Sequence, residues 1–219
     1  MEQLVDFWVK RFMNASIDRK GREMPGILVE VDGARVATID LSAMQVVDVS
    51  VHGGLDGENK ATLDAYGGNY ADGACGHLIY IEERVLLPGQ LVCVTFQAHC
   101  DNPDRGQTLD ELYPGEEAIP RTDFSINEER AAELRARPRL HEEFIAQVDT
   151  ASGERMTAVS DEFNTSFRFG LLWDWLHPDR ARMSLTTYCL EDVLARRPGT
   201  KHVESMLDLG QSVVFSLVR

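Results

Sequence analysis

No stretch of this sequence approaches the roughly 20 consecutive apolar residues that a helix needs to cross a bilayer. The first 20 residues carry Glu2, Asp6, Lys10 and Arg11 among their apolar positions, so they also lack the apolar block of a signal peptide. From these two absences we expect a soluble, cytoplasmic protein that does not bind membranes.

Cysteine is scarce, since the 219 residues include only four, at irregular spacing. Four such residues are too few for a disulfide scaffold, and a reducing compartment would keep them as free thiols. The glycine-rich residues 53–76 lack the Gly-Lys-Ser/Thr ending of a phosphate-binding loop and the ligand spacing of an EF-hand. We therefore expect no cofactor, and we interpret this segment as a long surface loop that is a candidate binding surface.

Basic residues are outnumbered, with 22 Lys and Arg against 36 Asp and Glu, which gives a net charge of −14. Such a surface repels nucleic acid phosphates and anionic lipids, so direct binding of DNA or RNA is not expected. Two interpretations of the acidity remain open: it only keeps the protein soluble, or it also attracts a basic protein partner.

The sequence does contain a strong strand pattern at residues 77–96, where two apolar runs flank Pro88 and Gly89. A Pro-Gly pair between such runs is typical of a turn, so the segment predicts a β-hairpin. Centring the hairpin on this turn pairs Val85 with Val92 and gives the hairpin one apolar face and one polar face.

The residues before this hairpin predict one helix and three strands. Residues 2–13 carry apolar side chains at helical spacing, as in an amphipathic helix that docks on an apolar surface. Asp32-Gly33 lies between the alternating runs 27–31 and 36–41, which predicts a second hairpin, and residues 44–51 predict a third strand.

Residues 101–124 are rich in acids, proline and glycine, which predicts an exposed linker between two halves of the chain. We expect its acids to bind a basic partner; they are Asp101, Asp104, Asp110, Glu111, Glu116 and Glu117.

A pair of helices is predicted after the linker. Ser125 and Glu128 form a capping-box pattern, and residues 125–137 have high helix propensity. Pro138 separates this helix from a second one, in which Leu140 and Phe144 begin a stripe of apolar residues at steps of four.

The rest of the chain predicts more strands. Residues 166–175 alternate, with aromatic side chains on one face, and residues 183–190 are expected to return beside them, followed by a short helix at 191–197. Trp173 and Trp175 share the aromatic face, where they are either partner-binding anchors or core residues. Residues 205–219 repeat the Gly-Gln turn pattern of residues 84–98, either through internal duplication or by chance.

From these elements we expect an α+β fold with antiparallel β-rich halves, a tandem repeat if the similarity reflects duplication, and a central helical pair. The expected domains are residues 1–100 as an N-terminal helix plus antiparallel β domain, 101–124 as an acidic linker, and 125–219 as the helical pair plus a second β-rich half.

The segment Val46–Phe96 resembles a pattern in small bacterial proteins of unknown function, in which such a hairpin ends a compact β domain. The matching motifs are Gly53-Gly54-Leu55-Asp56, His77-Leu78 and Leu87-Pro88-Gly89-Gln90. The resemblance implies a β-rich architecture and a bacterial origin, and it implies no activity.

A possible catalytic or metal site is the group Cys75, His77 and Cys100, which the hairpin register would place at one end of the apolar face, with His99 on the other face. These residues could ligate zinc, or His77 could activate a Cys100 thiolate, but the spacing lacks the regularity of zinc motifs. Inert thiols beside a hydrogen-bonded histidine are the interpretation that we adopt, so no metal or catalytic residue is assigned.

The function that we expect is a non-enzymatic protein-binding module, such as a bacterial inhibitor or immunity protein, that acts through its acidic surface on a basic partner. The alternatives are a small cysteine/histidine hydrolase or metal enzyme, and a subunit of a larger assembly in which the helix at 2–13 docks on a neighbour.

Overall fold

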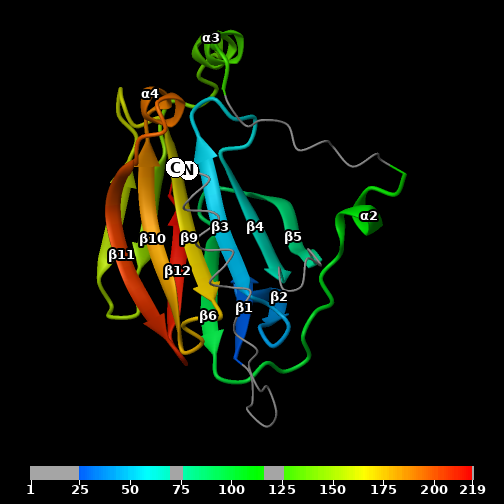
Figure 1. The fold of residues 1–219 in the computed structure, drawn as a ribbon. Coiled ribbons are helices and arrows are strands. Elements are labelled where there is room, and N and C mark those ends of the chain that lie inside the picture. The colour runs from blue at the N-terminus through cyan, green and yellow to red at the C-terminus, as the bar shows by residue number, and fades with distance from the viewer. Residues whose placement is uncertain (1–24, 70–75, 116–125, 219) are drawn as a thin grey trace.

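The computed structural model describes residues 25–69, 76–115 and 126–218, which form a β-sandwich of two six-stranded antiparallel sheets (Figure 1). The first sheet has the strand order β2-β1-β6-β12-β7-β8, and the second has the order β11-β10-β9-β3-β4-β5. The fold is thus mostly β with few helices, which replaces the more general α+β class that the sequence suggested.

The strands of the first sheet are β1 (Gly26–Val31), β2 (Ala34–Asp40), β6 (Leu91–Gln97), β7 (Ile145–Asp149), β8 (Arg155–Val159) and β12 (Ser212–Leu217). Those of the second are β3 (Val46–Gly54), β4 (Ala61–Asn69), β5 (Gly76–Leu86), β9 (Ser166–Asp174), β10 (Arg180–Tyr188) and β11 (Thr200–Asp208). The described helices are α2 (Leu109–Leu112), α3 (Glu128–Ala136) and α4 (Leu190–Leu194).

The first predicted hairpin is confirmed, because β1 and β2 pair on either side of Asp32 and Gly33. Both residues have positive φ, 53° and 75°, as a two-residue turn that matches the twist of the strands requires. The strand at 46–54, the strands on either side of residues 175–179 and the short helix after residue 189 are also present.

The hairpin predicted at residues 77–96 is wrong. The turn itself forms, since the Gln90 N–H donates to the Leu87 carbonyl oxygen (3.1 Å) and Gly89 has φ 90°. However, β5 pairs with β4 at the edge of the second sheet, whereas β6 pairs with β1 and β12 in the first. The turn therefore carries the chain from one sheet to the other, and Val85, which the hairpin placed on the core face, is 44% exposed.

The C-terminal turn makes the same kind of connection. The Gln211 N–H donates to the Asp208 carbonyl oxygen (3.1 Å), and Gly210 has φ 84°. Here β11 forms the other edge of the second sheet, and β12 lies beside β6 in the first. Each half of the chain therefore contributes three strands to each sheet.

The glycine-rich segment is not one long loop, because residues 61–69 form β4 between β3 and β5. Gly67 lies inside this strand, where a Cβ atom would meet the Val47 Cγ2 atom at 3.0 Å. Close packing of neighbouring strands therefore accounts for a glycine that the sequence suggested was part of a loop.

The predicted helical pair is a single helix followed by a strand. The Asn127 side chain caps α3 by accepting from the Arg130 N–H (2.8 Å), while Ser125, the predicted cap, lies outside the described residues. Phe144 and Val148 belong to the region of β7 and are fully buried, whereas Leu140 is 53% exposed. A spacing of four fits the alternation of a strand as well as the turn of a helix, which explains the wrong prediction.

The core lies between the two sheets, with the Phe215 ring of β12 stacked against Phe167 and Phe169 of β9 at centroid distances of 5.8 and 5.4 Å. Trp173 is 1% exposed in this core, which corrects its assignment as a partner-binding anchor. Trp175 is partly buried and packs against the same core.

Three parts of the chain contain predictions that the described residues do not include: the helix at 2–13, Cys75, and Glu116 with Glu117. Within the described ranges, no helix is long and apolar enough to span a bilayer.

Candidate functional site

The predicted acidic linker begins as an ordered segment, residues 98–115, which we call the acidic loop. Asp104 fastens it to β2: its backbone N–H donates to the Thr38 carbonyl oxygen (2.8 Å), and its carboxylate accepts from the Thr38 N–H (2.7 Å). The same carboxylate binds the Arg35 guanidinium at 2.8 Å. Asp104 therefore holds the loop in place, at an exposed position where a surface ion pair alone would contribute little.

A second attachment joins the acidic loop to the edge of the second sheet. Gln107 and Ile79 of β5 exchange two backbone hydrogen bonds of 2.8 Å. Gly106 permits this approach, because a Cβ atom there would lie 2.8 Å from the Leu78 Cβ atom. The loop therefore covers part of an edge strand whose backbone groups would otherwise be unpaired.

The short helix α2 ends the described part of the loop, and a capping box defines its start. The Thr108 N–H donates to the Glu111 carboxylate at 3.0 Å, and the Glu111 N–H donates to the Thr108 hydroxyl at 3.3 Å. The bond from the Thr108 backbone, with the Arg105 guanidinium that pairs with Glu111, lowers the pKa of Glu111.

The acids of the loop thus divide into two kinds. Asp104 and Glu111 bind groups of the protein itself, whereas Asp101 and Asp110 are exposed and have no ion pair within the described residues. Leu109, between these groups, is 53% exposed. The loop therefore presents carboxylates and an apolar side chain on a backbone that the protein fixes.

The predicted cysteine and histidine group does not assemble as expected, because the hairpin that would pair His77 with Cys100 is absent. His77 pairs with Gly68 and its ring lies 5.5 Å from that of Tyr66. Burial, and then the Asp40 carboxylate, raises the pKa of the Cys100 thiol to about 11. A raised pKa leaves less of the thiolate, which is the nucleophilic form, so Cys100 is not an activated nucleophile.

We expect Cys100 to react slowly with iodoacetamide at pH 7.5. Its pKa of about 11 against an ordinary 9.0 leaves about 100-fold less thiolate, since each pKa unit is a factor of ten. The rate should rise as the pH approaches the pKa. Mass spectrometry of the Cys100 peptide over time measures the rate, with the urea-unfolded protein as the control. Equal rates in the folded and unfolded protein would contradict this assignment.

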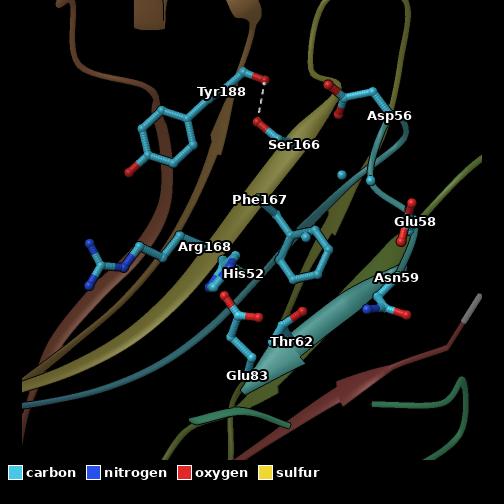
Figure 2. A pocket seen from close by; sticks show the side chains of 13 residues that line it. His52, Asp56, Glu58, Asn59, Thr62, Glu83, Ser166, Phe167, Arg168 and Tyr188 are labelled. Carbon is cyan, nitrogen blue, oxygen red and sulfur yellow. Dashed lines mark hydrogen bonds between the residues drawn. The ribbon is translucent and has the colours of Figure 1, made fainter. Parts of the chain in front are cut away.

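The outer face of the second sheet carries a hollow with a volume of 480 Å³ (Figure 2). It lies where β3 and β9 meet the turn at residues 53–59, and Figure 2 shows Asp56, Glu58 and Glu83 around it, with the Arg168 side chain directed away toward Tyr188. Carboxylates therefore surround the hollow, and a guanidinium lies at its border.

Arg168 crosses the sheet to a buried carboxylate. Its Nη2 group donates to Asp48 Oδ2 at 2.7 Å, and Asp48 is only 7% exposed. Burial disfavours the charged guanidinium, but Asp48 and the hydroxyls of Tyr66 and Tyr188 outweigh that effect, so the pKa of Arg168 is raised. The pair organises the middle of the outer face.

Sequence reasoning missed this face, although its signal was present. Asp48 and Arg168 are charged residues at alternate positions of otherwise apolar strands, which is the pattern of an outward-facing row. Which of these residues meet depends on the β3–β9 pairing, which joins segments about 120 residues apart. Within the described ranges, no three His, Cys, Asp or Glu side chains are grouped so that they could hold a metal ion.

Comparison of the chain with protein-family models, with curated proteins and with solved structures found no match.

Proposed function

We propose that this chain is a non-enzymatic protein-binding module of the bacterial inhibitor or immunity type, which acts in the cytoplasm on a basic protein partner through its acidic surface. The observation that carries the proposal is the acidic loop, which is fixed to β2 and to β5 and still presents Asp101 and Asp110 to solvent.

The fixed backbone supports binding for an energetic reason. A segment that becomes ordered only on binding loses conformational entropy at that moment, whereas an ordered loop has little left to lose. The contacts of Asp104 and Glu111 keep the loop ordered, so the carboxylates of Asp101 and Asp110 are held at fixed positions. Exposed Leu109 beside them gives the combination of an apolar contact and charged rim that protein interfaces use.

The charge of the whole chain supports the choice of a basic partner. A net charge of −14 attracts a cationic protein over a distance and raises its association rate, and it repels nucleic acids. Because this attraction acts through solvent, salt weakens it. Binding should therefore depend strongly on ionic strength.

We expect the double substitution Asp101→Asn and Asp110→Asn to weaken partner binding about tenfold, which corresponds to about 1.4 kcal/mol. Partners retained by the tagged protein from its host at low salt are identified by mass spectrometry, and surface plasmon resonance across a salt series then gives the association rate, the dissociation rate and the Kd of each. The weakening is expected because the substitutions remove two carboxylates that have no ion pair with the described residues.

The matched control is the double substitution Glu154→Gln and Asp179→Asn, two exposed acids outside the acidic loop. It removes the same charge, so it should reduce the association rate through the net charge but leave the dissociation rate unchanged. If both double variants lower the affinity equally, or if binding is insensitive to salt, the acidic loop is not the binding surface.

We further propose that the two halves of the chain arose by duplication, with the boundaries 1–100, 101–124 and 125–219 that the sequence suggested. Equivalent contacts at both crossing turns support it. The Gly89 N–H donates to the Leu217 carbonyl oxygen (2.7 Å), and the Gly210 N–H donates to that of Phe96 (2.6 Å), so that donors and acceptors each differ by 121 positions.

The strand irregularities support the same proposal. Within the second sheet, β4 has two register shifts, at Leu63 and Ala65 and at Ala65 and Tyr66, and the shift of β10 at Leu185 and Thr186 lies 120 positions after the second of them. The strand orders also correspond, since β3, β4 and β5 follow one another to one edge as β9, β10 and β11 do to the other.

A further inference from the structure

A second hollow on the outer face of the second sheet has a volume of 430 Å³, and we call it the arginine hollow. It is built from two neighbouring cross-strand rows of the β3, β9, β10 and β11 region (Figure 1). In one row Arg182 of β10 lies between Leu172 of β9 and Met206 of β11. The residues that line the arginine hollow are Val46, Leu172, Asp174, His177, Arg180, Arg182 and Met206.

Two guanidinium groups line this hollow. Arg180 and Arg182 are two positions apart on β10, so their side chains leave the same face of the sheet, about 7 Å apart along the strand. Arg182 Nη1 forms an ion pair with Glu204 Oε1 at 3.9 Å, a separation that is too long for a hydrogen bond. No carboxylate of the described residues lies within ion-pair distance of Arg180.

The nearby carboxylates make their hydrogen bonds with other groups. Glu204 binds the Lys201 ammonium group. Asp174, the carboxylate of the hollow itself, bonds the His177 ring (3.0 Å) and accepts from the Leu176 N–H (3.0 Å) in the turn after β9. Because Arg182 forms only this long ion pair and no hydrogen bond with either carboxylate, its N–H groups can still donate to a ligand that brings its own acceptor oxygens.

The hollow also has an apolar side. Leu172 and Val46 are partly buried, and Met206 is 51% exposed, although the outer face of a sandwich is ordinarily polar. Because Leu172 and Met206 are the cross-strand neighbours of Arg182, apolar residues flank Arg182 on both adjacent strands. A ligand that fits must offer an anionic group next to an apolar stem.

We propose that the arginine hollow binds a small apolar carboxylate, whose carboxylate pairs with Arg182 and whose stem covers Leu172 and Met206. A guanidinium matches a carboxylate with two parallel hydrogen bonds, and the apolar contact adds the burial of both surfaces. The volume of 430 Å³ suits a ligand of about ten non-hydrogen atoms, since small-molecule pockets measure roughly 300–1,000 Å³. This proposal does not rest on the protein-binding function.

The test is a titration of the full chain with octanoate, followed by NMR amide shifts. Acetate supplies the head group alone and octanol the stem alone. Octanoate should shift the amides of β9, β10 and β11, while acetate and octanol should each bind at least tenfold more weakly. Arg182→Gln should weaken octanoate binding about tenfold or more, as expected for the loss of a charged hydrogen-bonding partner.

The matched control is Arg84→Gln, which removes the same charge from an exposed position of β5 and should leave octanoate binding unchanged. Both arginines are exposed, so neither substitution should affect folding. Three results would overturn the proposal: no shift at millimolar octanoate, equal affinity in the Arg182→Gln variant, or shifts outside the hollow. A peptide with a C-terminal leucine that binds more tightly than octanoate would overturn the assignment to a small molecule.

Discussion

Replacing Phe215 by alanine is expected to lower the free energy of unfolding by about 3–5 kcal/mol, the usual cost of removing a buried phenyl ring. Phe215 is completely buried on β12, and its ring stacks on Phe167 and Phe169 from the other sheet. Each sheet is held by its own hydrogen bonds, so the sheets cannot close fully on the cavity. Urea denaturation measured by circular dichroism gives the value.

Phe163→Ala is the matched control, because it removes the same ring from a loop position that is 68% exposed. Its effect should stay within about 0.5 kcal/mol. A loss for Phe215→Ala as small as that of the control would mean that the two sheets do not pack through β12 and β9, and would contradict the sandwich.

The sequence predicts the buried face of a strand better than it predicts the strand's neighbours. Alternation marks β9 correctly, since Phe167, Phe169 and Leu171 all face the core. Alternation specifies which face of a strand is buried but not which strand lies beside it. In a sandwich, consecutive strands can satisfy the same pattern by crossing to the opposite sheet, and the Pro88-Gly89 turn does so.

The site is predictable to a smaller extent, because it depends on contacts between distant segments. The sequence predicts that the acids of residues 101–117 are exposed, but it cannot show that Asp104 binds Arg35, 69 positions away. The arginine hollow was not predicted at all. Arg182 is an unremarkable basic residue in the sequence, and it meets Leu172 and Met206 only because β9 and β11 flank β10.

Replacing Gly53 by alanine is expected to destabilise the protein by about 3 kcal/mol, at the upper end of the usual range for overpacking. A Cβ atom at this position would lie 2.0 Å from the Lys60 carbonyl oxygen and 3.0 Å from the Phe167 ring. The Lys60 oxygen belongs to the backbone next to β4, which β3 holds by its ladder of hydrogen bonds. Relief of the contact must therefore separate the start of β4 from β3.

The conservative comparison is Gly76→Ala, in which the nearest atom to the new Cβ is 4.0 Å away. That substitution should leave the stability unchanged or raise it by up to about 1 kcal/mol, because alanine restricts the unfolded chain. Thermal and urea unfolding of both variants measure the difference. If Gly53→Ala were as stable as Gly76→Ala, the close approach of β3 to residue 60 would be wrong, and with it the shape of the 480 Å³ hollow that Gly53 lines.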